Sequence, residues 1–198
     1  MTDSLVILDP TDEQRPIVSR LAQRPSRLAG TLGIIDISKA RGDIFCDELE
    51  LLLAKQSTSV KIERFRKPTF TKPAADDFRE EVAERCNAII QALADWGSCT
   101  SCSVHDLADY EVQGIPSVMI ASEAFKEAAT HQAVALGIKG IAQQAVYVPH
   151  PIQDATDEEI RQKARLAFPN IMAALTVKWT LSSYKESKYD WRNNPHNE

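Results

Sequence analysis

The chain has 198 residues, of which 43% are hydrophobic and 26% charged, enough for one domain with a sizeable core. Its net charge of −5 is made of mixed signs spread along the sequence, which excludes the basic stripe of a nucleic-acid-binding protein. No apolar run approaches the roughly 20 residues that span a bilayer, and the N-terminus lacks a signal-peptide pattern. We therefore expect a cytoplasmic protein that binds neither nucleic acid nor membrane, with cysteines that are reduced, catalytic or buried.

Strand and helix patterns alternate along the chain. After a polar, proline-containing segment, short apolar runs predict strands at residues 31–38, 59–65, 87–94, 114–122 and 144–151. Helical spacing predicts helices between them, over 42–55, through Val82 and Cys86, through Val104 and Glu111, and over 123–137. A last helix starts near Thr156, where Glu159 completes a capping box.

This alternation predicts an α/β fold. Right-handed crossovers between the strands give a parallel sheet with helices on both faces, and five strands favour a three-layer, flavodoxin-like arrangement in the order 2-1-3-4-5. We expect that domain over residues 29–176, after an N-terminal extension over 1–28. The remaining tail, 177–198, contains four large aromatic residues, so we expect it to pack on a subunit interface of a homo-oligomer or on a partner protein.

The chemistry is expected where the strand order reverses, between the first and third strands, because ligands of open parallel sheets bind beyond the carboxyl ends of the strands. The loop "DISKARGD", with Ser38 and Lys39, and the loop "DWGSCTSC" meet there. Thr69, after the second strand, and His150, after the fifth, open on the same rim. Lys39 could bind an anionic substrate, favour a thiolate, or be solvated; His150 could be an acid or base, or pack the end of its strand.

The pair Cys99 and Cys102 stands where a strand turns into a helix. The free amides and dipole of the helix start favour a thiolate at Cys99, and a sulfur one turn later can resolve a mixed disulfide or sulfenic acid. Gly97 and Ser98 would let the backbone approach a ligand, and Ser98 or Thr100 could cap the helix. The alternative is that both thiols are small buried residues in a tight turn.

Other residues give weaker signals. Cys46 and Cys86 lie on apolar helix faces and are expected in the core, whereas His105 could meet Cys102 on one helix face. The chain lacks a second Cys-x-x-Cys pair, so we expect no metal site. It also lacks the glycine fingerprint of dinucleotide binding and a phosphate loop, so no cofactor is evident, although flavin binding needs no short motif.

Five segments together resemble the UGSC family: "GIIDISKARGDIF", "RKPTFTKPAADDF", "ALADWGSCTSCSVHD", "GIPSVMIASEAF" and "VPHP". Members of that family carry selenocysteine or cysteine, then Gly-Ser-Cys, after the third strand. More distantly, the chain resembles the selenoprotein subunits of glycine and proline reductases, in which a selenocysteine and two cysteines recur at the spacing of Trp96, Cys99 and Cys102. The resemblance implies a redox or nucleophilic site built on sulfur or selenium.

Trp96 departs from this pattern, because an indole is not a nucleophile. Three explanations are open. The selenocysteine codon UGA is one base from the tryptophan codon UGG, so Trp96 could be a substitution or a misread codon. The lineage could instead depend on Cys99, with Trp96 as an aromatic wall against the substrate. Finally, the site could bind without turnover.

The leading hypothesis is a thiol-dependent enzyme that acts on a small electrophilic organic substrate. Cys99 would be the redox-active or nucleophilic thiolate, Cys102 the resolver, and Lys39 and His150 further catalytic residues. Ser38, Thr69, Trp96, Gly97, Ser98 and Thr100 would contact the substrate. The alternatives are a non-redox cysteine lyase, hydratase or hydrolase, and a binding or accessory subunit of a reductase-type complex.

Overall fold

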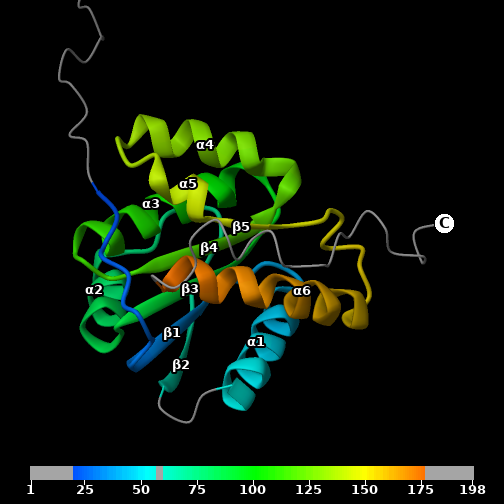
Figure 1. Ribbon diagram of the computed structural model, residues 1–198. Coiled ribbons are helices and arrows are strands. Elements are labelled where there is room, and N and C mark those ends of the chain that lie inside the picture. Colours follow the sequence, from blue (N-terminus) through cyan, green and yellow to red (C-terminus); the bar gives the residue numbers. More distant parts are fainter. Residues whose placement is uncertain (1–19, 57–59, 177–198) are drawn as a thin grey trace, which may run out of the picture.

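Five parallel strands form one sheet in the order β2-β1-β3-β4-β5, as the sequence predicted (Figure 1). The computed structural model describes residues 20–56 and 60–176. The strands are β1 (Gly30–Asp36), β2 (Val60–Arg66), β3 (Ala88–Ala94), β4 (Ser117–Ser122) and β5 (Val146–Val148). The aromatic tail and most of the N-terminal extension lie outside the described residues, so the prediction of a subunit interface there stays a prediction.

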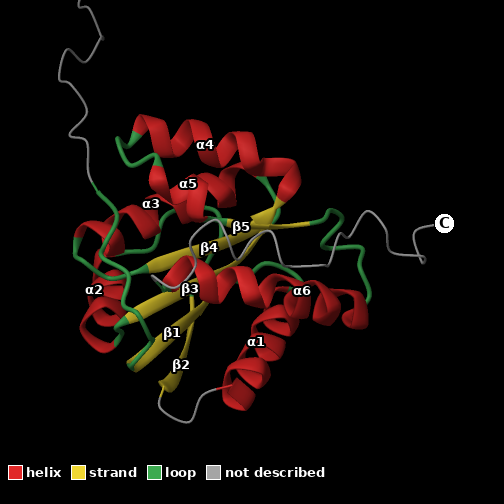
Figure 2. Ribbon diagram, viewed as in Figure 1, coloured by secondary structure: helices red, strands yellow, loops and turns green. Residues whose placement is uncertain are grey.

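Helices cover both faces of the sheet and complete three layers (Figures 1 and 2). One face carries α1 (Gly42–Gln56) and α6 (Asp157–Leu175), which pack on each other. The other carries α2 (Asp76–Arg85), α3 (Gly97–Val112), α4 (Lys126–Ala135) and α5 (Gly140–Gln144). This is the predicted flavodoxin-like arrangement. Among the helices that the structure describes, none combines the length and the apolar composition needed to cross a bilayer.

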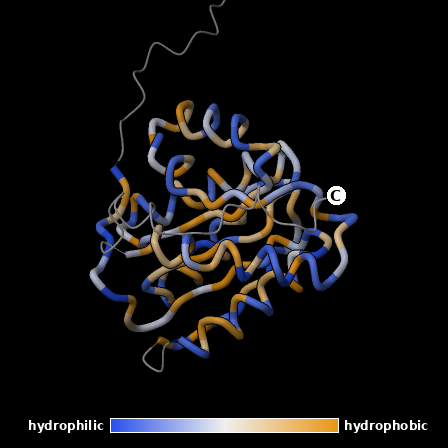
Figure 3. The backbone as a smooth tube through the Cα atoms, turned by 45° about the vertical axis from the view of Figure 1, so that its right-hand side comes forward, coloured by the Kyte–Doolittle hydropathy of each residue, from blue (hydrophilic) through white to orange (hydrophobic). Residues whose placement is uncertain are grey.

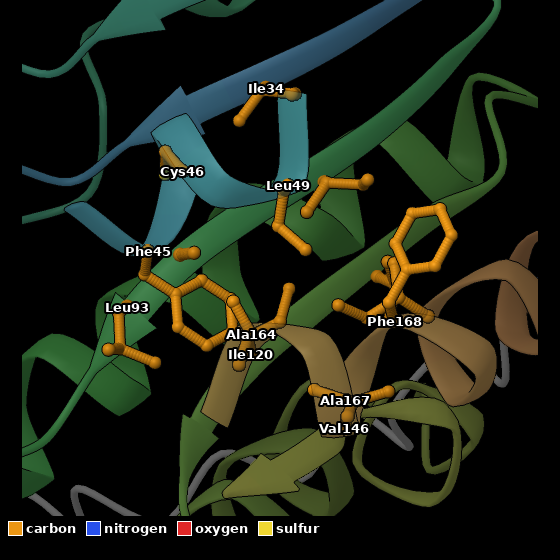
Figure 4. Close-up of a cluster of buried hydrophobic side chains, with 14 of the residues drawn as sticks. Ile34, Phe45, Cys46, Leu49, Leu93, Ile120, Val146, Ala164, Ala167 and Phe168 are labelled. Carbon is orange, nitrogen blue, oxygen red and sulfur yellow. The ribbon is translucent and has the colours of Figure 1, made fainter. Parts of the chain in front are cut away.

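The central strands are buried on both sides, which explains their continuous apolar runs. Every residue of β3 is buried, whereas β2, at the edge, keeps only Phe65 fully inside. Figure 3 shows hydrophobic stretches running through the middle of the molecule, and hydrophobic and hydrophilic residues alternating along the peripheral turns. Between the sheet and the α1–α6 pair, Phe45 and Leu49 share one apolar cluster with Phe168 (Figure 4). Cys46 belongs to the same cluster and Cys86 to the one beneath α2, which confirms both as core residues.

The structure differs from the predicted elements mainly after β4. The predicted helix over 123–137 begins as a 3₁₀ turn, η1 (Glu123–Phe125), where Ser122 accepts a hydrogen bond from the amide of Ala124. The short helix α5 was not predicted. Its first residue, Gly140, lies so close to Leu21 that a Cβ there would come within 2.6 Å of that side chain, so α5 depends on a distant segment.

Residues 20–28, which the structure describes ahead of β1, are held at the amino ends of the strands by a buried ion pair. Arg24 Nη1 lies 2.6 Å from Glu111 Oε2 on α3, and the same carboxylate accepts hydrogen bonds from the amides of Ala22 and Ser117. Arg24 also donates to the carbonyl of Ala174 near the end of α6. This contact therefore joins the segment to α3, β4 and α6 at the amino ends of the strands, whereas the predicted site lies at their carboxyl ends.

Candidate functional site

The loops that follow β1, β3 and β5 are tied together by a buried ion pair at the carboxyl ends of the strands. Lys39 Nζ lies 2.9 Å from Asp95 Oδ1, and both side chains are almost fully buried. Gln153, after β5, donates from Nε2 to Asp95 Oδ2 at 2.7 Å. The chain thus brings residues of three loops together at the reversal of strand order, where the topology placed the site.

Two aromatic rings enclose the Lys39 ammonium and bring in the loop after β2. Nζ lies 4.6 Å from the centroid of Phe70 and 5.7 Å from that of Trp96, within the range of cation–π attraction. The Lys39 ammonium is paired with Asp95 and packed against two rings. Lys39 is therefore buried, and the hypothesis that it is a solvated loop lysine does not describe this structure. Trp96 is 60% exposed and lies beside the ion pair.

Cys99 is fully buried at the start of α3. Its Sγ accepts a hydrogen bond from the backbone N–H of Trp96 at 3.3 Å and donates to the carbonyl of the same residue at 3.2 Å. The predicted capping by Ser98 or Thr100 is wrong: Trp96 is the N-cap residue, and the sulfur satisfies its amide. In this conformation the thiol is enclosed, as in the alternative of a small buried residue in a tight turn, so Cys99 would have to become exposed before it could attack a substrate.

Cys102 lies one turn further along α3 and retains 9% exposure. Burial raises the pKa of its thiol, and the negative charges of Asp106 and of an ionised Cys99 raise it further, whereas the positive charge of Lys67 lowers it. At neutral pH Cys102 is therefore a thiol, and it becomes a nucleophile only if its surroundings stabilise the anion.

A buried polar network that sequence reasoning missed lies beside Cys102. Lys67, after β2, makes a 2.6 Å ion pair with Asp106 of α3, and both side chains are at most 1% exposed. Asp106 also accepts from the amide of Ala74 at 2.7 Å and from Gln91 Nε2 at 3.0 Å. Lys67 and Asp106 each stand in a motif that the resemblance quoted, but nothing in the spacing showed that they meet.

A model of the UGSC family matches residues 6–177. The chain belongs to the UGSC family. Among solved structures, it is similar to the flavodoxin-like domain of a Synechococcus sp. protein, at 13% identity and a TM-score of 0.41, over 71% of this chain and 90% of that one. No curated protein matches the chain.

Other residues that the sequence assigned to the site of this UGSC protein also lie in loops at the carboxyl ends of the strands. Their hydrogen bonds connect them to neighbouring loops and strands rather than to the thiols. The hydroxyl of Ser38 donates to the carbonyl of Lys67 and accepts from Arg66, and Thr69 hydrogen-bonds to Thr71 within the loop after β2. His150 is exposed, with Nδ1 3.1 Å from Ser122 Oγ.

Near the start of α3, the remaining candidates divide into open and enclosed positions. Ser98 is exposed, and a Cβ on Gly97 would meet nothing within 4 Å, so space rather than close packing surrounds this turn. Thr100 is fully buried, and its hydroxyl has no hydrogen-bond partner within the described residues. His105 contacts Gln132 of α4 rather than Cys102.

Asp36, the last residue of β1, is a further buried carboxylate at this end of the sheet, and the sequence did not single it out as a candidate. Its side chain is buried, Oδ1 accepts from the amide of Ser38 at 2.7 Å, and Oδ2 lies 3.7 Å from Arg66. Burial raises its pKa, although the amide of Ser38 and the charge of Arg66 act in the opposite direction. Among the described residues, no three His, Cys, Asp or Glu side chains converge as a metal site would require.

Proposed function

We propose that this protein is a thiol-dependent enzyme that acts on a small electrophilic organic substrate. One observation carries the proposal: Cys99 and Cys102 lie one turn apart at the start of α3, at the reversal of strand order, with an N–H donor on the first sulfur. That N–H and the start of a 16-residue helix both place partial positive charge beside the Cys99 sulfur.

The exposed Trp96 side chain, at the N-cap of the helix that carries both thiols, supports a substrate position at this end of α3. Its face can stack on an apolar or unsaturated substrate, and the open space around Gly97 leaves the adjacent backbone accessible. In this proposal Lys39 holds Asp95 and Trp96 in place, while Ser38, Thr69 and Ser98 offer hydroxyls along the same edge. His150, exposed near the end of β5, is the residue of this rim suited to proton transfer.

The reaction uses both sulfurs. The Cys99 thiolate displaces a leaving group X from a substrate R–X, forming Cys99–S–R and releasing X as its anion. The Cys102 thiolate then attacks the Cys99 sulfur, so that a Cys99–Cys102 disulfide forms and R leaves with the electron pair and takes up a proton. In sum, R–X and two thiols give R–H, H–X and a disulfide, which an external dithiol reduces back.

The test is to trap the mixed disulfide with methyl methanethiosulfonate, a small electrophile, and to weigh the intact protein. In the wild-type chain we expect the methylthio group to be lost within the reaction, leaving an internal disulfide. In Cys102→Ser the methylthio adduct should persist on Cys99, and in Cys99→Ser rapid modification should be absent. Cys46 and Cys86, whose thiol pKa values are raised by burial, provide reference thiols in every variant.

Other outcomes would select the alternatives. An adduct on Cys99 that persists even in the wild-type chain would favour a non-redox nucleophile, such as a lyase, hydratase or hydrolase, because Cys102 would then not resolve it. If neither thiol is modified faster than Cys86, the thiol enzyme is refuted, and a binding or accessory subunit becomes the better hypothesis.

A further inference from the structure

We infer that Lys67 is a positioning residue for the resolving step: its ammonium, held by Asp106 beneath the 67–74 loop, stabilises the Cys102 thiolate. The inference rests on the proposed function for its purpose, since a resolving thiol must ionise to attack the first sulfur. Its measurement needs neither substrate nor turnover, so the two can fail separately.

The geometry brings the Lys67 ammonium to the face of α3 that carries Cys102. Cys102 and Asp106 are four residues apart on α3, so their side chains lie on the same helix face. Lys67 Nζ is 2.6 Å from Asp106 Oδ2 and donates to the carbonyl of Lys72 at 3.1 Å. An ammonium has three N–H donors, so these two acceptors leave one for a neighbouring anion.

Burial gives this charge its effect. The Lys67 side chain is 1% exposed and that of Asp106 fully buried, so water screens neither charge well. The charged groups that act on Cys102 are Lys67 from the loop, and Asp106 and Cys99 from its own helix. Lys67 is the one positive charge among these groups, and it opposes the burial that keeps the thiol protonated.

The two members of the ion pair should have opposite effects, and this separates an electrostatic role from a structural one. Lys67→Met removes the charge that stabilises the thiolate, so Cys102 should be alkylated more slowly. Asp106→Asn removes the charge that opposes it, so alkylation should be faster. If the pair served only to hold the loop on α3, both changes would loosen the loop and expose Cys102, and both would accelerate its alkylation.

The experiment measures iodoacetamide alkylation of Cys102 by peptide mass in the full chain across neutral to alkaline pH, with Cys86 as the reference for global opening. We expect Lys67→Met to slow the reaction of Cys102 about three- to tenfold, the change that one pKa unit produces after the opposing rise in nucleophilicity. Asp106→Asn should accelerate it without affecting Cys86. Lys67→Arg should retain most of the wild-type rate, and Lys72→Met, an exposed lysine of the same loop, should leave it unchanged.

Faster alkylation of Cys102 in both Lys67→Met and Asp106→Asn would overturn the inference, and so would unchanged rates. If Lys67→Met does not fold, Asp106→Asn and Lys67→Arg decide: a slower or unchanged Cys102 in Asp106→Asn contradicts the inference. The alkylation rates and the methyl methanethiosulfonate test can also disagree. If the alkylation rates are as expected but no methylthio adduct forms on Cys99, Lys67 still stabilises the Cys102 thiolate, and only the proposed function is refuted.

Discussion

The Lys39–Asp95 pair is the residue-scale contact on which the arrangement of the site depends. It joins the loops after β1 and β3, Gln153 adds the loop after β5, and Phe70 adds the loop after β2. A buried ion pair costs much of its attraction in desolvation, but removing one partner leaves a charge without compensation. The pair therefore positions these loops more than it adds net stability.

Asp95→Asn should destabilise the fold by about 3 kcal/mol, because the Lys39 ammonium would remain buried without a counterion. The double variant Lys39→Met with Asp95→Asn should recover much of that loss. Urea unfolding measures both. The control is Asp157→Asn, which removes the partner of Arg41 in a more exposed pair and should cost below about 1 kcal/mol. Equal effects of the two Asp→Asn changes would contradict the positioning role.

Asp36 gives a pH-dependent prediction. Its pKa is raised in the folded state, so the folded protein binds this proton more tightly than the unfolded chain, and the ionised carboxylate lowers stability at neutral pH. Asp36→Asn, which can still accept from the Ser38 amide, should be more stable than the wild type at pH 7. This advantage should shrink as the pH falls through the raised pKa and vanish below the ordinary pKa of aspartate. Urea unfolding at several pH values tests it; a variant less stable than the wild type at pH 7 would contradict it.

At this scale the sequence selected the thiols and Lys39 as candidate site residues but did not predict which side chains contact them. A strand ending in an acid, as at Asp36, and an acid directly before Trp96, as at Asp95, were available signals. The pairing of Lys67 with Asp106 could not be read from spacing, because it depends on how the 67–74 loop folds back over α3.

At the scale of elements, local patterns predicted most strands and helices. The central strands are continuous apolar runs because both of their faces are buried, and the helices repeat apolar residues at helical spacing. The capping box of α6 was predicted from Thr156 and Glu159 alone and is confirmed, with each residue hydrogen-bonded to the backbone of the other. The helix α5 was missed because its position depends on Leu21, which no local pattern reveals.

Thr156→Ala should cost about 1 kcal/mol in the free energy of unfolding, because the amide of Glu159 loses its side-chain acceptor. Thermal or urea unfolding measures the loss. Thr130→Ala is the control: this exposed threonine lies inside α4 and caps nothing, so we expect a change within about 0.5 kcal/mol. Equal losses at the two positions would contradict the capping role.

At the scale of the whole molecule, the strand order followed from alternation and crossover handedness, whereas the attachment of the N-terminal segment did not. Arg24 reaches α3, β4 and α6 at once, and such a contact between distant segments leaves no local signature. Residues 20–28 therefore pack on the α/β domain through Arg24 and Glu111, and the prediction of an extension over 1–28 stays a prediction.

Arg24→Ala should destabilise the protein by about 3 kcal/mol, because Glu111 would keep a buried charge without its partner. It should also make the chain near residues 20–28 more sensitive to limited proteolysis. Arg20→Ala, at an exposed position of the same segment, should change the free energy of unfolding by less than about 0.5 kcal/mol. Unaltered stability in Arg24→Ala would mean that the segment contributes little to the fold.

The most direct measurement of the thiol site is peptide mapping of the native protein after equilibration in glutathione buffers of increasing oxidation. We predict a single cross-link, between Cys99 and Cys102, while Cys46 and Cys86 remain free because each lies in a core cluster that contains no second thiol. Four free thiols across the whole series, or a cross-link that includes Cys46 or Cys86, would contradict a redox pair at the start of α3.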